Sequence, residues 1–571
     1  MNLFTISESF SRSVWNVFES TSNVSYILSK WISMYMTLSH ITPINKPMDC
    51  PGLFDSSREL IPGLQPYVSA VHPANVTFIP EGNLAYPNPV YDLPEFCRFG
   101  GEFNTSEMSK FRFEVWIPKV ENWNGRFAFV GNGGAAGGVN YPDMGVPLDK
   151  YGFAVASTDT GHHGTDTDGA FAMSNPESQI DFGHRAVHLS AVFSKQIVEL
   201  YYGKKAAFNY WIGCSSGGKQ GMKSAQAYPE DFDGIVAGAP AQWWSRLNGF
   251  AIHINMLNSN VTTPGATIPT TFFQKLHQEV IYQCDGLDGV HDGIIANPRR
   301  CKPDLERISC KHNHHSPHGA VTNCLSEEQI VTLKEIYKNW TSASGDLLYP
   351  TAEPGSEFGW ELSVSGIPVP IARDYFSYQV LNKTRTFDLQ TNETNLQQLT
   401  IIADDTDPGQ INAINPNLER FFRRGGKLMH YHGWADPLIP AGSSIWYYEH
   451  VMNYFDREDV SGDYRLFMLP GVGHCGGGPG ANGFGGAGQK GVARGGFGQS
   501  DVFDAKHDMI LATMAWVEKG QLPEHLVGVK YVNDNITLGT TLNRLFCPYP
   551  QEAIYQGGDV NSAQSYSCEF P

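Results

Sequence analysis

The strongest constraint in the sequence is a Gly-x-Ser-x-Gly pattern at residues 213–217, placed between a predicted strand and a predicted helix. The apolar run 208–212 precedes the pattern, and residues 218–222 can open a helix. In that context the pattern is typical of a nucleophile elbow, whose glycines permit a sharp turn that exposes the central serine. A loop that is merely rich in glycine and serine is the alternative, because the chain contains 59 glycines. The flanking strand favours the elbow and predicts Ser215 as a nucleophile.

Two residues that can activate a serine follow later, each just after a predicted strand. Asp436 follows the apolar run 427–432, and His474 follows the run 465–469. A histidine is needed to accept the serine proton, and a carboxylate is needed to fix the tautomer of that histidine and stabilise its charged form. A single Asp or His after a strand is usually an ordinary loop residue, but the order serine, aspartate, histidine is that of α/β-hydrolases. The three together predict a catalytic triad of Ser215, Asp436 and His474.

A pair of cysteines flanks this triad. Cys214 directly precedes the predicted nucleophile, and Cys475 directly follows the predicted base. If the triad forms, these cysteines are neighbours in space, and a disulfide between them would hold His474 beside Ser215. The bond would close a very long loop, for which chain-entropy theory gives roughly 5 kcal/mol, less any strain in the folded state. We therefore expect Cys214 to be bonded to Cys475.

The combination of Cys-Ser, Asp and His-Cys resembles the tannase/feruloyl esterase family of secreted α/β-hydrolases. The residues that match the motif of this family are Cys214-Ser215, Asp436 and His474-Cys475. The resemblance also covers the glycine-rich segment 131–134, the block 156–162 and an aspartate cluster near residue 285, and it extends from about Cys50 to the C-terminus. It implies a carboxylic ester hydrolase that acts on phenolic acid esters through an acyl-enzyme.

Several activities fit this resemblance. Release of ferulate-like acids from plant cell-wall esters is the first expectation, with a small phenolic ester or a feruloylated polysaccharide as the binding partner. Hydrolysis of galloyl esters by a tannase is the alternative. A serine peptidase would use the same three residues, and a binding protein on a hydrolase scaffold would carry them without turnover. The complete triad disfavours the binding protein.

The net charge excludes two classes of partner. Aspartate and glutamate outnumber lysine and arginine by 58 to 40, which gives a net charge of −18. Such a charge argues against binding to nucleic acids and to anionic membranes. A chain of 571 residues is too long for one compact core, so a core with an insertion is expected.

The ten cysteines indicate an oxidising compartment, because all of them can pair. Locality suggests three pairs and leaves Cys50 with Cys97, although connectivity does not follow from sequence alone. The three local pairs are Cys284 with Cys301, Cys310 with Cys324, and Cys547 with Cys568. Acceptor sequences for N-glycosylation occur at Asn75, Asn104, Asn260, Asn339, Asn382, Asn392 and Asn535. We therefore expect a secreted, extracellular glycoprotein.

The N-terminal residues 1–45 do not match a standard signal peptide. Lys30 interrupts their apolar residues, and several serines precede these. No run of 18 apolar residues occurs in this segment, so no membrane span is predicted there. The cysteines and glycosylation sequences favour secretion, so we interpret the segment as an atypical leader.

The apolar periodicity predicts an α/β-hydrolase core interrupted by a large lid. The elements that indicate this core are predicted strands at 111–117, 126–130, 153–157 and 233–240 and a predicted helix at 182–202. This periodicity is then lost until residue 427. We therefore divide the chain into an N-terminal segment (1–45), a first part of the core (46–240), an inserted lid domain (241–426) and a second part of the core (427–571).

A glycine run at residues 131–138 follows the predicted strand 126–130. It is either a flexible linker or an oxyanion-hole loop, and its place after an early strand favours the loop. Negative charge builds on the carbonyl oxygen during acyl transfer, and backbone N–H groups stabilise it. We expect these to come from Ser216 and from Gly133 or Gly134.

Residues 285–294 hold three carboxylates with interleaved glycines. Oxygen ligands in a flexible loop suit Ca²⁺, although the spacing is not that of an EF-hand and a solvated acidic turn is the alternative. The family resemblance implies a structural calcium site in the lid. The ligands it implies are the side chains of Asp285, Asp288 and Asp292 and the backbone oxygens of Val290 and Ile294.

Overall fold

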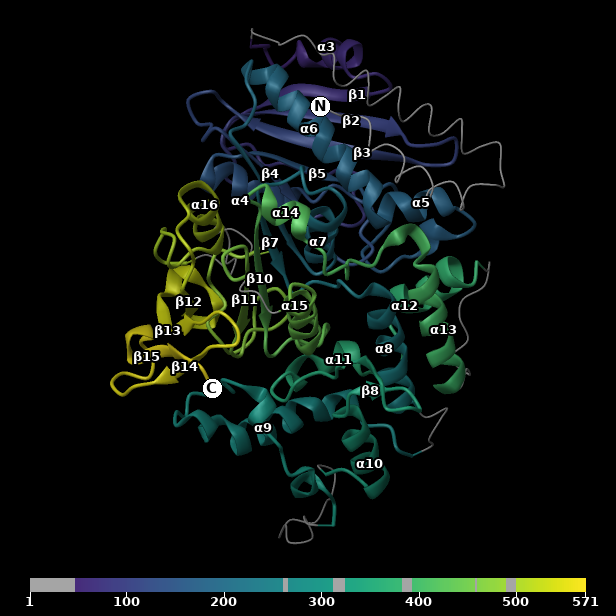
Figure 1. Cartoon of the computed structure of the whole chain (residues 1–571), viewed down its shortest axis with the longest axis vertical. Coiled ribbons are helices and arrows are strands. Elements are labelled where there is room, and N and C mark those ends of the chain that lie inside the picture. Colours follow the sequence, from purple (N-terminus) through teal and green to yellow (C-terminus); the bar gives the residue numbers. More distant parts are fainter. Residues whose placement is uncertain (1–46, 260–264, 312–323, 383–392, 457–459, 489–499) are drawn as a thin grey trace, which may run out of the picture.

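The computed structural model of the chain describes residues 47–259, 265–311, 324–382, 393–456, 460–488 and 500–571 (Figure 1). The expected leader, residues 1–45, lies outside the described residues, as do the glycosylation sequences at Asn260 and Asn392. Within the described ranges, no helix has the length and the apolar composition that crossing a membrane requires.

A mixed sheet of nine strands organises the fold (Figure 1). Its strands are β1 (Gln65–His72), β2 (Phe96–Asn104), β3 (Lys110–Pro118), β4 (Arg126–Val130), β5 (Ala154–Thr158), β6 (Phe208–Cys214), β7 (Gly234–Gly238), β10 (Lys427–Gly433) and β11 (Tyr464–Leu469). Their spatial order is β1-β2-β3-β5-β4-β6-β7-β10-β11. The six strands from β5 to β11 run parallel, whereas β1, β2 and β3 pair antiparallel. The α/β-hydrolase fold expected from the sequence is thus present.

The sequence pattern does not predict β1 or β2. Strand β1 lies at the sheet edge, holds Pro66 and alternates between exposed and half-buried residues, so its apolar signal is weak. Strand β2 contains the pair Gly100-Gly101, which lowers its strand propensity. Both strands are stabilised by pairing rather than by their local pattern.

Helices cover both faces of the sheet (Figure 1). One face packs against α3 (Leu53–Leu60), α6 (Ala186–Tyr202), α7 (Ser216–Ala227), α14 (Glu419–Arg423) and α15 (Gly442–Tyr454). The other face packs against α4 (Tyr141–Tyr151) and α16 (Met509–Lys519). The helix predicted over 182–202 includes a π-helical turn at Asp181–Arg185, which leads into α6.

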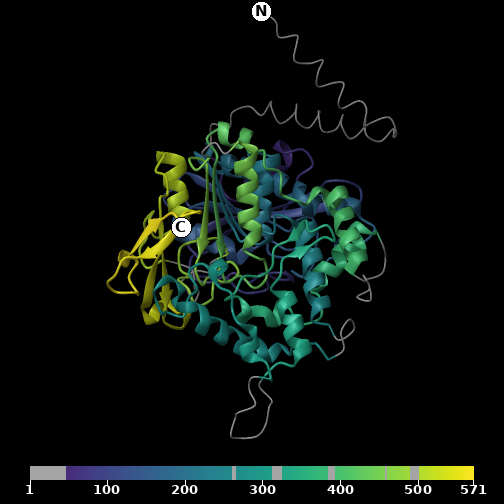
Figure 2. The ribbon, with the colours of Figure 1, turned by 60° about the horizontal axis from the view of Figure 1, so that its bottom comes forward.

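The segment between β7 and β10 lies below the sheet, where its helices surround a core of their own (Figures 1 and 2). It contains α8 (Trp244–Leu257), α9 (Phe273–Cys284), α10 (Glu327–Ile336), β8 (Trp340–Thr341), β9 (Leu347–Tyr349), α11 (Trp360–Ser363), α12 (Pro370–Asp374) and α13 (Glu393–Thr406). Its fully buried Trp340, Tyr349 and Trp360 anchor that core. Near the end of this segment, Leu418 and Phe421 pack instead in the core between the main sheet and the helices α6, α7 and α15.

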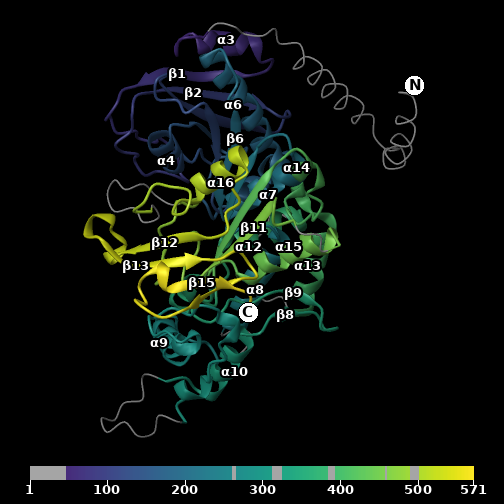
Figure 3. The same cartoon turned by 60° about the vertical axis from the view of Figure 1, so that its left-hand side comes forward.

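The C-terminal residues add two hairpins beside the sheet (Figure 3). These pair β12 (Leu526–Tyr531) with β13 (Thr540–Phe546) and β14 (Glu552–Tyr555) with β15 (Tyr566–Glu569). The short helix α5 (Pro176–Ile180) precedes the π-helical turn that leads into α6.

Five disulfides cross-link the described chain, and they join the cysteines in the pairs expected from the sequence: Cys50–Cys97, Cys214–Cys475, Cys284–Cys301, Cys310–Cys324 and Cys547–Cys568.

Candidate active site

Ser215 occupies a strained turn between β6 and α7. Its backbone has φ 63° and ψ −124°, a conformation that non-glycine residues rarely adopt. Glycine is required two positions before it, because a Cβ on Gly213 would lie 2.5 Å from the backbone oxygen of Gly217. A Cβ on Gly217 would lie 3.2 Å from the oxygen of Asn132, a tight contact that the neighbouring loop would have to relieve. The turn therefore has the geometry of a nucleophile elbow, with the serine at the carboxyl edge of the sheet.

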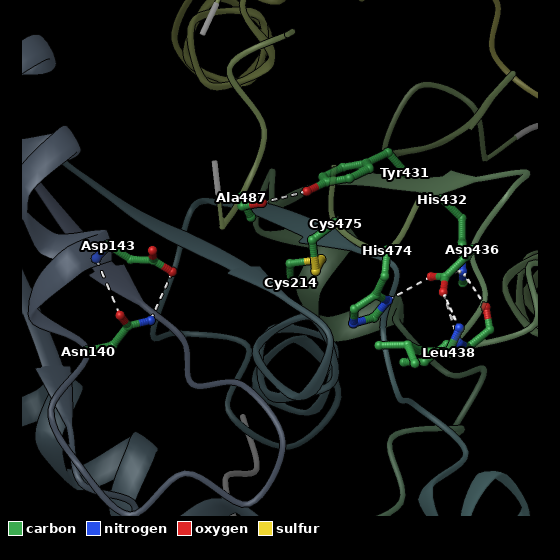
Figure 4. The surroundings of a disulfide bond; sticks show 11 residues. Asn140, Asp143, Cys214, Tyr431, His432, Asp436, Leu438, His474, Cys475 and Ala487 are labelled. Carbon is green, nitrogen blue, oxygen red and sulfur yellow. Dashed lines mark hydrogen bonds and ion pairs between the residues drawn. A yellow bond between two sulfur atoms is a disulfide. The ribbon is translucent and has the colours of Figure 1, made fainter. Parts of the chain in front are cut away.

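Asp436 and His474 lie at the same edge, after β10 and β11 (Figure 4). Nδ1 of His474 is 2.7 Å from Oδ2 of Asp436, which is fully buried. Because Nδ1 faces a carboxylate, it carries the ring proton, and Nε2 remains an acceptor. His474 is thus held in the tautomer that a general base for a serine requires.

Asp436 is anchored from several sides. Its Oδ1 accepts the N–H groups of Leu438 at 2.8 Å and Ile439 at 2.9 Å (Figure 4). Its Oδ2 also lies 3.0 Å from Nε2 of His432. Burial alone would raise the pKa of Asp436, but the attraction of the imidazolium form of His474 and the hydrogen bonds from both histidines outweigh it and hold the pKa well below its usual range. The carboxylate therefore stays ionised.

A chain of buried hydrogen bonds, which the sequence reasoning missed, extends behind Asp436. Nε2 of His432 faces two acceptors, Asp436 and the carbonyl of Ile439, so it carries the proton and Nδ1 accepts from Ser444. His430 then donates through Nε2 to Ser444 at 2.8 Å, and the hydroxyl of Tyr464 donates to Nδ1 of His430 at 2.8 Å. The contacts fix both tautomers and orient the acid of the triad. Two histidines in one apolar strand are the only sequence signal for it.

The disulfide between Cys214 and Cys475 brings the nucleophile and the base together (Figure 4). The two Cα atoms are 5.9 Å apart. Ser215 and His474 line one cavity, although among the described residues no hydrogen bond joins the serine hydroxyl to the imidazole. Such bonds are often long without substrate and tighten when it binds.

The loop after β4 lies beside the nucleophile, because its residues 131–134 line the same cavity as Ser215. The hydroxyl of Ser216 donates to the carbonyl of Gly134 at 2.7 Å and so ties this loop to the elbow. The N–H of Gly133, a predicted oxyanion donor, donates to the hydroxyl of Tyr86 at 2.8 Å. Gly133 can serve an oxyanion only if this tyrosine moves. Tyr86, which lies on a loop without a recognisable motif, was not predicted from the sequence.

Replacement of Ser216 by alanine is expected to lower kcat by about tenfold. The substitution keeps the backbone N–H that the oxyanion needs but removes the hydrogen bond to Gly134, so the loop loses an anchor worth about 1 kcal/mol. Steady-state kinetics with a thermal melt checks this expectation. A loss as large as that of a nucleophile mutant would contradict a backbone role for Ser216.

The catalytic cavity has a volume of about 440 Å³. Apolar side chains of the inserted segment form one wall, and the residues after Asp436 form another. The apolar members include Trp244, Leu247, Phe250, Ile254, Val364, Ile371, Leu438 and Ile439. A cavity of this size and lining accepts a single aromatic acyl group.

The predicted calcium ligands lie on one loop after α9. Oδ1 of Asp285 accepts the N–H groups of Asp292, Gly293 and Ile294, and Oδ1 of Asp288 accepts that of Val290. Burial raises the pKa of Asp288 and of Asp292, and the charge of a neighbouring carboxylate adds to each increase. The donors are hard oxygens, as Ca²⁺ prefers.

The loop has suitable oxygen ligands for a metal, but the contacts of these ligands in the structure compete with metal binding. Asp292 forms an ion pair with Arg544 of β13, which supplies a positive charge where the ion would. In the part of the chain that the structure describes, no three His, Cys, Asp or Glu side chains are arranged as a metal site. Binding of Ca²⁺ therefore requires the guanidinium to leave or share the carboxylate.

Known proteins match this sequence and this fold. A sequence profile described as "Tannase and feruloyl esterase" matches residues 97–569. A probable feruloyl esterase B-1 of Aspergillus terreus is 34% identical over 482 residues, which cover 83% of this chain and 86% of the relative. The crystal structure of feruloyl esterase B from Aspergillus oryzae is 32% identical with a TM-score of 0.81, and the match covers 91% of this chain and all of that one.

A more distant structure shares the fold. Tannin acyl hydrolase from Aspergillus niger superposes with a TM-score of 0.69 at 22% identity, over 91% of this chain and 94% of that one. The profile spans most of the chain, and the curated relative is matched over more than four fifths of both sequences. The chain therefore belongs to the tannase and feruloyl esterase family.

Proposed function

We propose that this protein is a serine carboxylic ester hydrolase that releases phenolic acids, ferulate in particular, from plant cell-wall esters. One observation carries the proposal: Ser215 and His474, the latter bound to Asp436, meet in one largely apolar cavity. The names of the relatives at 32–34% identity support ferulate as the acid.

The arrangement performs acyl transfer in two halves. Nε2 of His474 takes the proton of Ser215 while Oγ attacks the ester carbonyl, and the developing oxyanion is stabilised by the N–H of Ser216. The imidazolium then gives its proton to the alcohol oxygen, so that the alcohol leaves and the acyl-enzyme remains. Water repeats both steps and releases the acid. Asp436 stays ionised throughout and stabilises the imidazolium.

The cavity lining favours ferulate over gallate. Trp244, Leu247 and Phe250 of α8 present an apolar wall that suits the ring and side chain of a cinnamic acid. A galloyl group carries three hydroxyls, each of which needs a partner among the few polar side chains of the lining, whereas ferulate carries one hydroxyl and a methoxy group. Tannase activity is therefore the second candidate.

A hydrolysis panel tests the proposal. Methyl ferulate, methyl caffeate, methyl sinapate and methyl gallate are compared by kcat/KM, with a peptide substrate alongside. The proposal expects the ferulate ester to be the best substrate and the peptide to be inert. Preference for the gallate ester would establish the tannase alternative, and cleavage of the peptide would establish a peptidase.

The compartment we propose is extracellular. Five disulfides are typical of proteins from oxidising environments. The asparagines of four glycosylation sequences, Asn75, Asn104, Asn339 and Asn382, are exposed on the surface, where a glycan can be attached. Mass spectrometry of protein from the culture medium before and after removal of N-glycans tests secretion and glycosylation together.

We also propose that the 285–294 loop binds Ca²⁺ as a structural ion. Chelation is expected to lower the melting temperature. An ion that binds only the folded state adds about 2.7 kcal/mol to the free energy of unfolding when its concentration is 100 times its Kd. The variant Asp288→Ala should melt at one temperature with and without calcium. Calorimetry in calcium and in chelator measures the shift, with Asp346→Ala, an exposed aspartate elsewhere in the inserted segment, as the matched control. Equal melting temperatures for the wild type in both buffers would contradict the site.

A further inference from the structure

A second cavity, of about 800 Å³, lies at the carboxyl edge of the same sheet. The start of β1, the end of β2, the start of β3 and the loop after β5 surround it, and these contribute Tyr67, Asn104, Arg112 and Asp159. Nothing in the catalytic mechanism uses these residues. Ligands of open α/β sheets commonly bind outside this edge.

The second cavity is adjacent to the catalytic one. The loop after β4 separates them, because its residues 131–134 line the catalytic cavity and its residues 137–139 line the second one. The segment before it divides in the same way, since Asn83 lines the second cavity and Tyr86 the catalytic one. The ends of β5 and β6 are two strand positions apart, which is about 10 Å. A long substrate can therefore reach both cavities.

A buried carboxylate organises the floor of the second cavity. Glu114 is fully buried and accepts hydrogen bonds from Arg98, from Tyr67 at 3.1 Å and from Tyr141 at 2.7 Å. These bonds hold two aromatic rings and a guanidinium in fixed positions before any ligand arrives. Such preorganisation lowers the cost of binding.

The walls offer donors and acceptors of both charges. The side chain of Arg112 is 58% exposed, and its guanidinium lies 5.7 Å from the ring centre of Tyr67 and donates through Nε to Glu102. Oδ1 of Asp159 accepts the N–H groups of Arg112 and Gly161, both at 2.9 Å, while Oδ2 has no hydrogen-bond partner among the described residues. A half-exposed ring beside mixed polar groups suits a neutral polyhydroxy ligand better than an anion or a cation.

We propose that this cavity binds sugar residues of the polysaccharide that carries the ester, on the alcohol side of the scissile bond. The inference rests on the proposed function, because it assumes that the esterified alcohol is part of a glycan. A methyl ester ends at the catalytic cavity and cannot reach the second one. The sugar cavity therefore affects only substrates that have a carbohydrate part.

The test compares two substrates with one acyl group, a feruloylated arabinoxylan oligosaccharide and methyl ferulate. Arg112→Ala removes an exposed donor, and Asp159→Asn keeps the Oδ1 acceptor while an amide group replaces Oδ2, the oxygen without a partner. All proteins, the wild type included, are stripped of N-glycans before the measurements, so that no glycan chain on Asn104 fills the rim. Arg420→Ala is the matched control, because Arg420 forms an exposed ion pair with Glu230 away from both cavities.

The measured quantity is the ratio of kcat/KM for the oligosaccharide to kcat/KM for methyl ferulate. Each cavity variant should lower this ratio by at least about fivefold through KM, which corresponds to about 1 kcal/mol, and the control should leave it within about twofold. Titration calorimetry with the unesterified oligosaccharide should show weaker binding to both variants. An unchanged ratio and unchanged binding in both variants would overturn the sugar cavity.

The calorimetric arm separates this inference from the proposed function. If the wild type hydrolyses neither ferulate ester, the proposed function fails. Oligosaccharide binding that depends on Arg112 and Asp159 would still support the cavity in that case. Absence of binding to the wild type would overturn it, whatever the esterase activity.

Discussion

Ser215→Ala is expected to lower kcat by about four orders of magnitude or more, because the activated hydroxyl is the atom that forms the acyl-enzyme. The fold should be retained. Serine and alanine meet the same strain at φ 63°, and the serine hydroxyl anchors no other part of the described chain. The variant should show no burst of product and no acylated protein by mass spectrometry on mixing with an activated ferulate ester.

The comparison with Ser216→Ala makes this prediction specific. Both variants remove one hydroxyl from the same turn, but only Ser215 is at the elbow position, whereas Ser216 is buried and bonded to Gly134. Wild-type turnover by folded Ser215→Ala would show that another group is the nucleophile. The circular dichroism melt of each variant excludes unfolding as the cause of a loss.

The parallel strands of the sheet and the catalytic triad can be predicted from the sequence for one physical reason. Parallel strands are buried on both faces, so β4, β6 and β10 appear as nearly continuous apolar runs. Their carboxyl ends lie at one edge, and a reactive residue after each run must lie at that edge too. Ser215, Asp436 and His474 follow β6, β10 and β11, so the parallel topology brings the three residues to that edge.

Other features depend on contacts that no local pattern encodes. Tyr86 reaches Gly133 across 47 positions, and the link from Asp436 through His432 to Ser444 joins a loop, a strand and a helix. Strand β1 lies at the sheet edge and its residues are exposed or half-buried, so its sequence has no continuous apolar run that would predict a strand. Arg544 comes from a C-terminal hairpin, so its pairing with Asp292 could not be anticipated from the carboxylate cluster alone.

The double variant Cys214→Ala with Cys475→Ala is expected to lose about a hundredfold in kcat at a temperature where it remains folded. His474 belongs to a glycine-rich loop, and its one described side-chain contact with the triad is the bond to Asp436. Cys475 adopts φ 63°, a conformation that non-glycine residues rarely adopt. Without the disulfide the loop can shift, and displacement of a base by about 1 Å costs on the order of a hundredfold in rate.

A second double variant distinguishes positioning from general stabilisation. Cys547→Ala with Cys568→Ala removes the disulfide of the C-terminal hairpins, and neither of these cysteines lines the catalytic cavity. It should lower the melting temperature but keep kcat within about threefold, since catalysis needs His474 and Ser215 aligned and not that hairpin. Steady-state kinetics at 25 °C, with folding checked by circular dichroism, measures both variants. If the two lose kcat equally, the bond between Cys214 and Cys475 acts on the fold as a whole and the base is held by other contacts.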